Sequence, residues 1–241
     1  MRRVRALAFG ALLLSALACD SLPGKPAEAD RYVHPADVMD FDALYALNCS
    51  GCHGENGRLG PARALNDPLY LALVPPAELK RIIEKGVEGT PMPAFAQSAG
   101  GSLTQAQVDA LVSGLRESFG AEISGSLPPY RGSARGGNAS RGRVAFGTFC
   151  GDCHGVDGRG SDKAGSVVDS SFLGLVSDQS LRTSVIVGRP DLEMPSWRDY
   201  VPGRAMTERE IADVVAWLVA QRPEYPGQPH PPASAASEGG S

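Results

Sequence analysis

Two short stretches of the chain, residues 49–53 and residues 150–154, carry the same pattern of reactive side chains, Cys-x-x-Cys-His. On one turn of helix, cysteines at i and i+3 lie on the same face and can form thioether bonds to the two vinyl groups of a haem edge. The histidine at i+4 then lies where it can bind the haem iron. The pattern therefore predicts two covalently bound haem c groups. The predicted attachment residues are Cys49, Cys52 and His53 in the first copy and Cys150, Cys153 and His154 in the second.

Other uses of paired cysteines fit this chain less well. A zinc site would place its second Cys-x-x-Cys about 15–20 residues after the first, but here the pairs begin at residues 49 and 150. A thioredoxin-like dithiol would need a βαβ context, and it gives the following histidine no role. Zinc binding and disulfide formation stay open as alternatives, but the repeated five-residue string favours haem.

The chain also contains an internal duplication. When Cys49 is laid over Cys150, the pattern Cys-x-x-Cys-His-Gly-x-x-Gly-Arg coincides in both halves. When a gap of one residue is allowed in the first half, the match continues, and Met92-Pro93 aligns with Met194-Pro195. A repeat of this length indicates an internal duplication of one structural unit.

The repeated methionines, Met92 and Met194, are predicted to be the second axial ligands of the two irons. A thioether is a soft, weak donor, so methionine opposite histidine favours ferrous iron and raises the reduction potential. A single methionine is more often core filler, but two in register in a repeat favour ligation. Met206 competes in the second half yet matches no methionine in the first, and Met39 precedes its haem string, where a packing or surface role is expected.

With these motifs in place, each half resembles a class I c-type cytochrome domain, over about residues 37–120 and 140–222. The resemblance implies an all-α fold of two tandem domains, each a small helical bundle around one covalent haem. It also implies that a first helix carries the haem string, a methionine loop covers the distal side, and a last helix crosses the first. In this family a glycine-proline loop orients the histidine ring through the proline carbonyl. Gly60-Pro61 matches that loop, whereas the second half offers only the region around Ala164-Gly165.

The sequence predicts the last helix of each half independently of the resemblance. The segments starting at Thr104 and Thr207 read as capping boxes, in which the threonine accepts a backbone N–H and the residue three positions later reaches back. Apolar residues at helical spacing follow each box. Shorter helices are predicted after Pro76 and after Ser177 or Asp178.

In each half, the first and last helices are expected to cross, and the residues predicted at the crossing pair one large side chain with one small residue. The first half has Phe41 and Gly114 where the second has Gly142 and Trp217. Because close helix crossings need a small residue opposite a large one, we predict that Phe41 packs over Gly114 and that Gly142 lies under Trp217. Tyr45 and Phe146 are expected on the same inner faces. Haem propionates could pair with arginine, although a solvated side chain is an equal alternative for each of Arg58, Arg159 and Arg189.

The N-terminus has the pattern of a targeting segment. Residues 1–18 combine a basic stub with an apolar run too short to span a bilayer, and Cys19 follows. Residues 16–19 resemble a bacterial lipoprotein processing site, which predicts lipidation of Cys19, although Ala16-x-Ala18 also fits ordinary signal peptidase cleavage. The predicted location is the periplasmic side of the cytoplasmic membrane. The predicted organisation is a signal peptide (1–18), a tether (19–36), a first cytochrome c domain (37–120), a linker (121–139), a second cytochrome c domain (140–222) and a disordered tail (223–241).

The charge of the chain bears on its partners. Removal of residues 1–18 takes away three of 23 basic residues and none of 27 acidic ones, which leaves a net charge of −7. A negative protein is a poor ligand for nucleic acid and attracts basic docking partners over long range. Membrane contact is expected through the N-terminal lipid alone.

Together these features predict an electron-transfer protein and not an enzyme. With both axial positions filled, neither iron offers a site to substrate, and the expected chemistry is one-electron transfer. Expected donors are a quinol-oxidising complex or a dehydrogenase, and expected acceptors a terminal oxidase or a soluble cytochrome. A stand-alone shuttle and a fixed subunit of such a complex are equally open. The alternatives are a dihaem peroxidase with one open iron site and a haem-based sensor.

Overall fold

The computed structural model describes residue 27 and residues 31–132 and 136–223. The predicted signal peptide, Cys19 and almost all of the predicted tail lie outside the described residues. Met39–Ser241 form one compact unit, and Met1–Val38 form another whose described part contains the short 3-10 helix η3 (Pro35–Asp37). None of the helices in the described ranges combines the length and apolar character needed to cross a bilayer.

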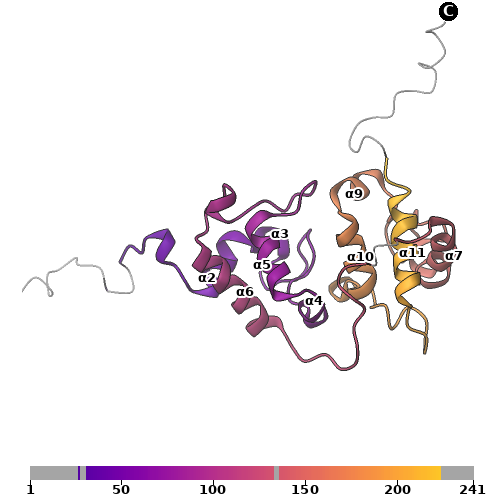
Figure 1. Ribbon diagram of the computed structural model, residues 1–241, viewed down its shortest axis with the longest axis horizontal. Coiled ribbons are helices and arrows are strands. Elements are labelled where there is room, and N and C mark those ends of the chain that lie inside the picture. Colours follow the sequence, from indigo (N-terminus) through magenta and orange to yellow (C-terminus); the bar gives the residue numbers. More distant parts are fainter. Residues whose placement is uncertain (1–26, 28–30, 133–135, 224–241) are drawn as a thin grey trace, which may run out of the picture. The chain divides into compact units, whose positions relative to one another are not determined.

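The larger unit contains two sets of helices in the same order, and its described residues form no strand (Figure 1). We call α2 to α6 the first domain and α7 to α11 the second domain. The first comprises α2 (Phe41–Asn48), α3 (Ser50–His53), α4 (Pro68–Leu73), α5 (Pro76–Lys85), η4 (Gln97–Ala99) and α6 (Gln105–Phe119). The second comprises α7 (Ala139–Phe149), α8 (Gly151–His154), α9 (Ser170–Leu175), α10 (Asp178–Val187), η5 (Pro190–Leu192) and α11 (Glu208–Val219). The predicted all-α fold is confirmed.

Both predicted capping boxes are present at the starts of α6 and α11. The Thr104 hydroxyl accepts the Gln107 amide at 3.3 Å, and the Gln107 side chain accepts the Thr104 amide at 3.0 Å. Thr207 and Glu210 repeat the arrangement at 3.2 and 2.9 Å. Each box satisfies two backbone donors that a helix start would otherwise leave unpaired.

The shorter helices also begin where their sequences predict. Pro76 is the first residue of α5, a position at which the missing amide of proline has no cost. The Ser177 hydroxyl accepts the Ser180 amide and so caps α10. Both helices end at a glycine with positive φ, Gly86 at 69° and Gly188 at 75°. L-residues rarely adopt that backbone conformation, so glycine allows a sharp turn after each helix.

The first and last helices of each domain cross as the complementary sizes predict. A Cβ atom at Gly114 would collide with the ring of Phe41. One at Gly142 would collide with the Asp213 carbonyl and lie 2.8 Å from Cβ of Trp217. The exchange of large and small residues between the two crossings is therefore confirmed.

Aromatic side chains line the inner faces of the first helices. Tyr45 and Phe146 are 4% and 2% exposed, which confirms their predicted positions. The Phe146 and Trp217 ring centroids lie 4.4 Å apart, and Tyr45 packs edge-on against Phe119 at 6.1 Å. The Tyr45 hydroxyl donates to the Gly54 carbonyl at 2.9 Å, which ties the inner face of α2 to the residue that follows the first haem string.

Candidate haem sites

Each Cys-x-x-Cys-His string occupies a short helix directly after the first long helix of its domain. The amide of His53 donates to the Cys49 carbonyl at 2.9 Å, and the amide of His154 donates to the Cys150 carbonyl at the same distance. These i to i+4 bonds hold each string as one helical turn, which is the conformation that the attachment chemistry requires. None of these four cysteines is in a disulfide.

The first cysteine in each string lies in surroundings that favour the neutral thiol. Burial, together with the neighbouring thiol, raises the pKa of Cys49 to about 11 and that of Cys150 to about 12. Both are therefore neutral thiols at pH 7. Within the described ranges, no group of three or more His, Cys, Asp and Glu side chains is placed to hold a metal ion. The zinc alternative gains no support.

Both histidine rings are held by a backbone carbonyl. His53 Nδ1 lies 2.7 Å from the Arg63 oxygen, and His154 Nδ1 lies 2.9 Å from the Gly165 oxygen. Because a carbonyl can only accept, Nδ1 carries the proton and Nε2 keeps a free lone pair for a metal. Burial lowers the pKa of His53, which also favours the neutral, ligating form. These bonds give the rings the fixed orientation and added basicity typical of metal-bound histidines.

The partner of His53 corrects one sequence prediction. The family resemblance assigned this carbonyl to Pro61, but it belongs to Arg63. The reason is a bond between the Ala62 amide and the Cys52 carbonyl at 2.9 Å, which holds the middle of the loop beside the haem string and brings the next residue to the imidazole. In the second domain the predicted region around Ala164-Gly165 does supply the carbonyl, from Gly165.

The two Met-Pro segments are held in the same way in both domains. A Cβ at Gly86 would lie 2.5 Å from the Met92 carbonyl oxygen, and one at Gly188 the same distance from that of Met194. The residue after each glycine donates its amide to the methionine carbonyl, from Val87 at 3.1 Å and from Arg189 at 3.0 Å. The structure therefore places Met92 and Met194 at equivalent points of the repeat. Their role as iron ligands stays a prediction.

The competing methionine has a structural role. Met206 is 3% exposed, and its amide donates to the Trp197 carbonyl at 2.9 Å. In the first domain Leu103 is 4% exposed and donates in the same way to Phe95 at 2.8 Å. Met206 is thus the counterpart of a buried leucine. Met39 precedes α2 and is 46% exposed.

The arginines considered as partners of the haem propionates differ in the hydrogen bonds and ion pairs that they already form with the protein. Arg189 forms a two-bond ion pair with Asp191, both contacts at 2.9 Å, and the Asp191 side chain is 1% exposed. Arg58 donates from Nε to the Asn66 carbonyl at 2.9 Å. Arg159 pairs loosely with Asp157 at 3.2 Å, and its side chain is 81% exposed. Arg189 is therefore already neutralised, whereas Arg159 remains largely solvated.

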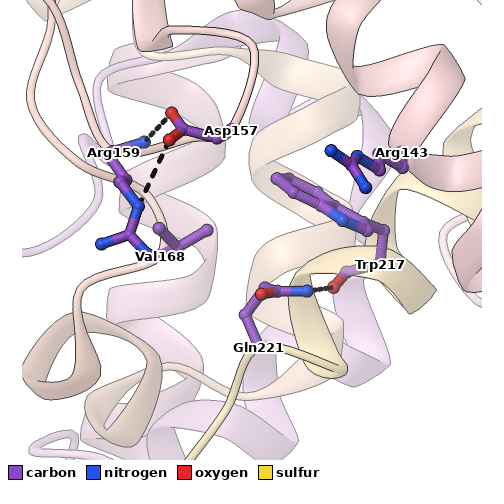
Figure 2. A pocket seen from close by; sticks show the side chains of 6 residues that line it. All are labelled: Arg143, Asp157, Arg159, Val168, Trp217 and Gln221. Carbon is purple, nitrogen blue, oxygen red and sulfur yellow. Dashed lines mark hydrogen bonds and ion pairs between the residues drawn. The ribbon is translucent and has the colours of Figure 1, made fainter.

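A surface cavity of about 240 Å³ lies in the second domain (Figure 2). Figure 2 shows the Asp157–Arg159 pair on one wall and Trp217 with Arg143 on another. None of the predicted haem residues lines it. It is therefore a different feature from the site built by the haem string, the carbonyl loop and the methionine loop. The full lining is Arg143, Asp157, Arg159, Val168, Trp217 and Gln221.

The donor set in each domain fits a c-type haem. Two cysteines free of disulfides, a histidine with its Nδ1 engaged and a methionine held by a fixed loop are the groups that such a haem needs from a protein. Cys49, Cys52, His53 and Met92 would hold the first haem, and Cys150, Cys153, His154 and Met194 would hold the second.

Comparison with known proteins identifies the family of the chain. The model of the family described as "Cytochrome C oxidase, cbb3-type, subunit III" matches residues 36–113 and 137–218. No match was found among curated proteins. Among solved structures, a chain of a reducing HAO-like protein complex from Kuenenia stuttgartiensis is similar at 20% identity and a TM-score of 0.43, over 80% of this chain and 98% of that one. Thiosulfate dehydrogenase from Marichromatium purpuratum is similar at 20% identity and a TM-score of 0.34, over 93% of this chain and 55% of that one.

Proposed function

Because the chain belongs to the family of the cbb3-type cytochrome c oxidase subunit III, we propose that it is a dihaem c-type cytochrome that passes single electrons between respiratory redox partners. Membership of the family makes it a redox protein with covalently bound haem c. The proposal of a two-haem electron carrier rests on one observation, which is made in both domains. A backbone carbonyl accepts a hydrogen bond from the histidine, and a glycine packs closely against the carbonyl of the methionine.

The residues divide the work in the same way in each domain. The cysteines attach the haem, and the bound haem supplies an iron atom that takes up and releases one electron. His53 and His154 would bind the iron through Nε2, with their basicity raised by the carbonyl bonds to Nδ1. Met92 and Met194 would supply the second ligand of each iron, and a weak thioether donor favours the reduced state and raises the potential.

An enzyme would need an open position for its substrate. A dihaem peroxidase would have to release Met92 or Met194 or supply another distal group. The remaining histidine in the described ranges, His34, caps η3 by accepting the Ala36 amide at 3.2 Å. No histidine in those ranges is therefore left over for distal chemistry, and the electron carrier is the better-supported function.

The proposed partners are redox proteins. The net charge of −7 after removal of residues 1–18 would attract a basic rim on an oxidase or a basic soluble cytochrome. Electrons would enter from a quinol-oxidising complex or a dehydrogenase. The same chemistry serves a mobile shuttle and a fixed oxidase subunit, and the family description favours the second.

We further propose that the chain is exported and tethered by a lipid on Cys19 to the periplasmic side of the cytoplasmic membrane. This proposal rests on the sequence of residues 1–19. Mass spectrometry of the mature N-terminus is expected to find a lipid-modified Cys19, and Cys19→Ala is expected to release the protein from membranes. A mature N-terminus at residue 19 without lipid would contradict the tether but not the export.

The central experiment is a pair of visible absorption spectra, oxidised and reduced, with the haem content determined per chain. We expect two low-spin haems and the weak far-red band of a methionine–iron(III) bond. Met92→Ala and Met194→Ala should each remove about half of that band. Met206→Leu is the matched control, because Leu103 fills the equivalent place in the first domain, and it should leave the band unchanged. A high-spin haem in the unmodified protein would instead support the enzyme or the sensor.

A further inference from the structure

One loop of the first domain reaches the second domain through a single side chain. The Arg63 guanidinium donates to Ser184 Oγ in α10 and, at 3.4 Å, to the carbonyl of Gly188, which ends that helix. Gly188 is the residue packed against the Met194 carbonyl. The side chain of Arg63 therefore contacts the base of the Met194 loop, and all of these residues belong to the one compact unit.

A second bond joins the same loop to the same turn. The Leu59 amide donates to Asp191 Oδ2 at 3.3 Å. Leu59 has a positive φ of 60°, and Asp191 is held in place by its ion pair with Arg189. Asp191 is thus a fixed acceptor, and both ends of the loop from residue 59 to residue 63 are anchored on the second domain.

Arg63 also has a fixed place within its own domain. Its guanidinium carbon lies 5.5 Å from the ring centroid of Tyr70, within the range of a cation–π contact. Burial lowers the pKa of the Arg63 guanidinium, although arginine stays charged at any physiological pH. A charged group removed from water in this way depends on its fixed partners, here Ser184 Oγ and the Gly188 carbonyl.

The backbone of this same residue holds the first histidine. The Arg63 carbonyl accepts from His53 Nδ1 at 2.7 Å, while the guanidinium of the same residue is bound to the second domain. The equivalent residue in the second domain is Gly165, which has no side chain, and an added Cβ there would meet nothing within 4 Å. Each histidine therefore has the same kind of hydrogen bond to a backbone carbonyl. Among the residues that the structure describes, the link from that carbonyl's residue to the neighbouring domain exists only for His53.

We propose that Arg63 is a positioning residue that couples the docking of the second domain to the ligand geometry of the first haem. Contact with Ser184 and Gly188 fixes the backbone of Arg63, and the Arg63 carbonyl fixes the orientation and basicity of His53. A change on α10 of the second domain thus alters the haem bound to His53. The inference rests on the proposed function in requiring that His53 binds the iron.

The test compares serine variants of the second domain in the full haem-loaded protein. Ser184→Ala removes the acceptor of the guanidinium without touching the first domain, and Ser171→Ala, an exposed serine on α9, is the matched control. The readouts are the low-spin electron paramagnetic resonance signals and the midpoint potentials of the two haems. Met92→His and Met194→His, one substitution in each domain, assign the signals. Amide exchange at Leu59 reports domain docking independently of the iron.

We expect Ser184→Ala to shift the signal and the potential of the first haem, to speed exchange at Leu59 and to leave the second haem unchanged. Arg63→Met should shift the first haem at least as far, because it also removes the bond to the Gly188 carbonyl. Arg63→Lys should shift it less than Arg63→Met, because lysine keeps the charge but not the forked donor geometry. The double variant Arg63→Met/Ser184→Ala should shift no further than Arg63→Met alone, because that substitution already removes the contact with Ser184.

The proposal is overturned if Ser184→Ala leaves the first haem unchanged, if it shifts only the second haem, or if the shifts of the single variants add. Failure of the proposed function would show elsewhere, as a first haem without histidine–methionine character in the unmodified protein. The Leu59 exchange measurement would still show in that case whether Arg63 and Ser184 hold the domains together.

Discussion

In the first domain a phenylalanine on α2 covers a glycine on α6, whereas in the second a glycine on α7 lies beneath a tryptophan on α11. The bulk has moved from the first helix to the last, and the crossing is filled in both cases. The comparison shows that a duplicated fold keeps the packed volume of a contact and not the residue that supplies it.

The carbonyl loops differ in another way. Arg63 and Gly165 have nothing in common as side chains, yet each presents the carbonyl that holds a histidine. A backbone bond leaves the side chain free to vary, and in the first domain that freedom is used for a contact with α10. The same type of histidine–carbonyl bond therefore occurs in two different surroundings.

The largest effect should come from removing the bulky member of each crossing. We expect Trp217→Ala to destabilise the second domain by about 4 kcal/mol and Phe41→Ala the first by about 3 kcal/mol, because a buried aromatic leaves a cavity and Phe41 is only half-buried. Calorimetry of the two domain transitions measures both. If the two crossings differ only in which helix supplies the large side chain, Phe41→Gly combined with Gly114→Trp should restore part of the stability that is lost when Phe41 is truncated. No gain in stability would contradict this interpretation of the crossings.

Filling the small member should also be costly, but unequally. Gly142→Ala is expected to destabilise by about 3 kcal/mol, because the new Cβ meets the backbone carbonyl of Asp213, and Gly114→Ala by about 2 kcal/mol, because the new Cβ meets the ring and the Cβ of Phe41, a side chain that can shift further than a backbone carbonyl. Gly147→Ala is the control: it lies in α7 with nothing within 4 Å of its Cβ and should stabilise by about 0.5 kcal/mol. Equal losses at residues 114 and 142 would contradict the distinction between ring and backbone.

The capping boxes should behave alike in both domains. Thr104→Ala and Thr207→Ala are each expected to cost about 1 kcal/mol, because each leaves a helix-start amide unpaired. Urea unfolding of each variant gives the value. Thr148→Ala, an exposed helix-interior threonine that caps nothing, should change stability by less than about 0.5 kcal/mol. A loss in only one domain would show that the boxes are not equivalent.

The smallest effect should be a difference in acid sensitivity. The Asp213 carboxylate accepts from Arg141 and from the Asn138 amide, and the hydrogen bond from Arg141 lowers the pKa of that carboxyl. Since the folded pKa is depressed, the stabilisation is complete above the unfolded pKa of about 3.9 and is lost as the pH falls below it. The first domain has alanine, Ala110, at this point of the last helix.

Thermal unfolding between pH 6 and pH 2 tests this difference. The second domain should lose the Asp213 contribution as the pH falls below about 4, and Asp213→Asn should flatten that part of its profile. The effect is small because Arg141 is half exposed and solvent screens the pair. An Asp213→Asn profile parallel to that of the unmodified protein would contradict the assignment.

The sequence predicts most of the scaffold because side-chain type determines it. The haem strings, the two Met-Pro segments, the capping boxes and the reversed Phe41/Gly114 and Gly142/Trp217 crossings all depend on particular side chains at particular spacings. Such features follow from the amino-acid sequence alone.

The partner of His53 could not be predicted from residue type, because any residue can supply a backbone carbonyl. The proline motif pointed to Pro61, two residues too early. The internal repeat did contain the answer: the one-residue adjustment that aligns Met92 with Met194 also aligns Arg63 with Gly165. The bond from Arg63 to Ser184 carries no comparable signal, since it joins residues 121 positions apart with no repeat to match it.

The reversed crossings also bear on how two similar domains in one chain fold without exchanging helices. If α2 paired with α11, Phe41 and Trp217 would compete for one space, and if α7 paired with α6, Gly142 and Gly114 would face each other across a void. Both mispaired arrangements would be less stable than the native pairing, the first because of overpacking and the second because of an empty cavity. A duplication with identical halves would lack this protection, so the divergence at four positions gives each first helix a preferred partner while the chain is still assembling.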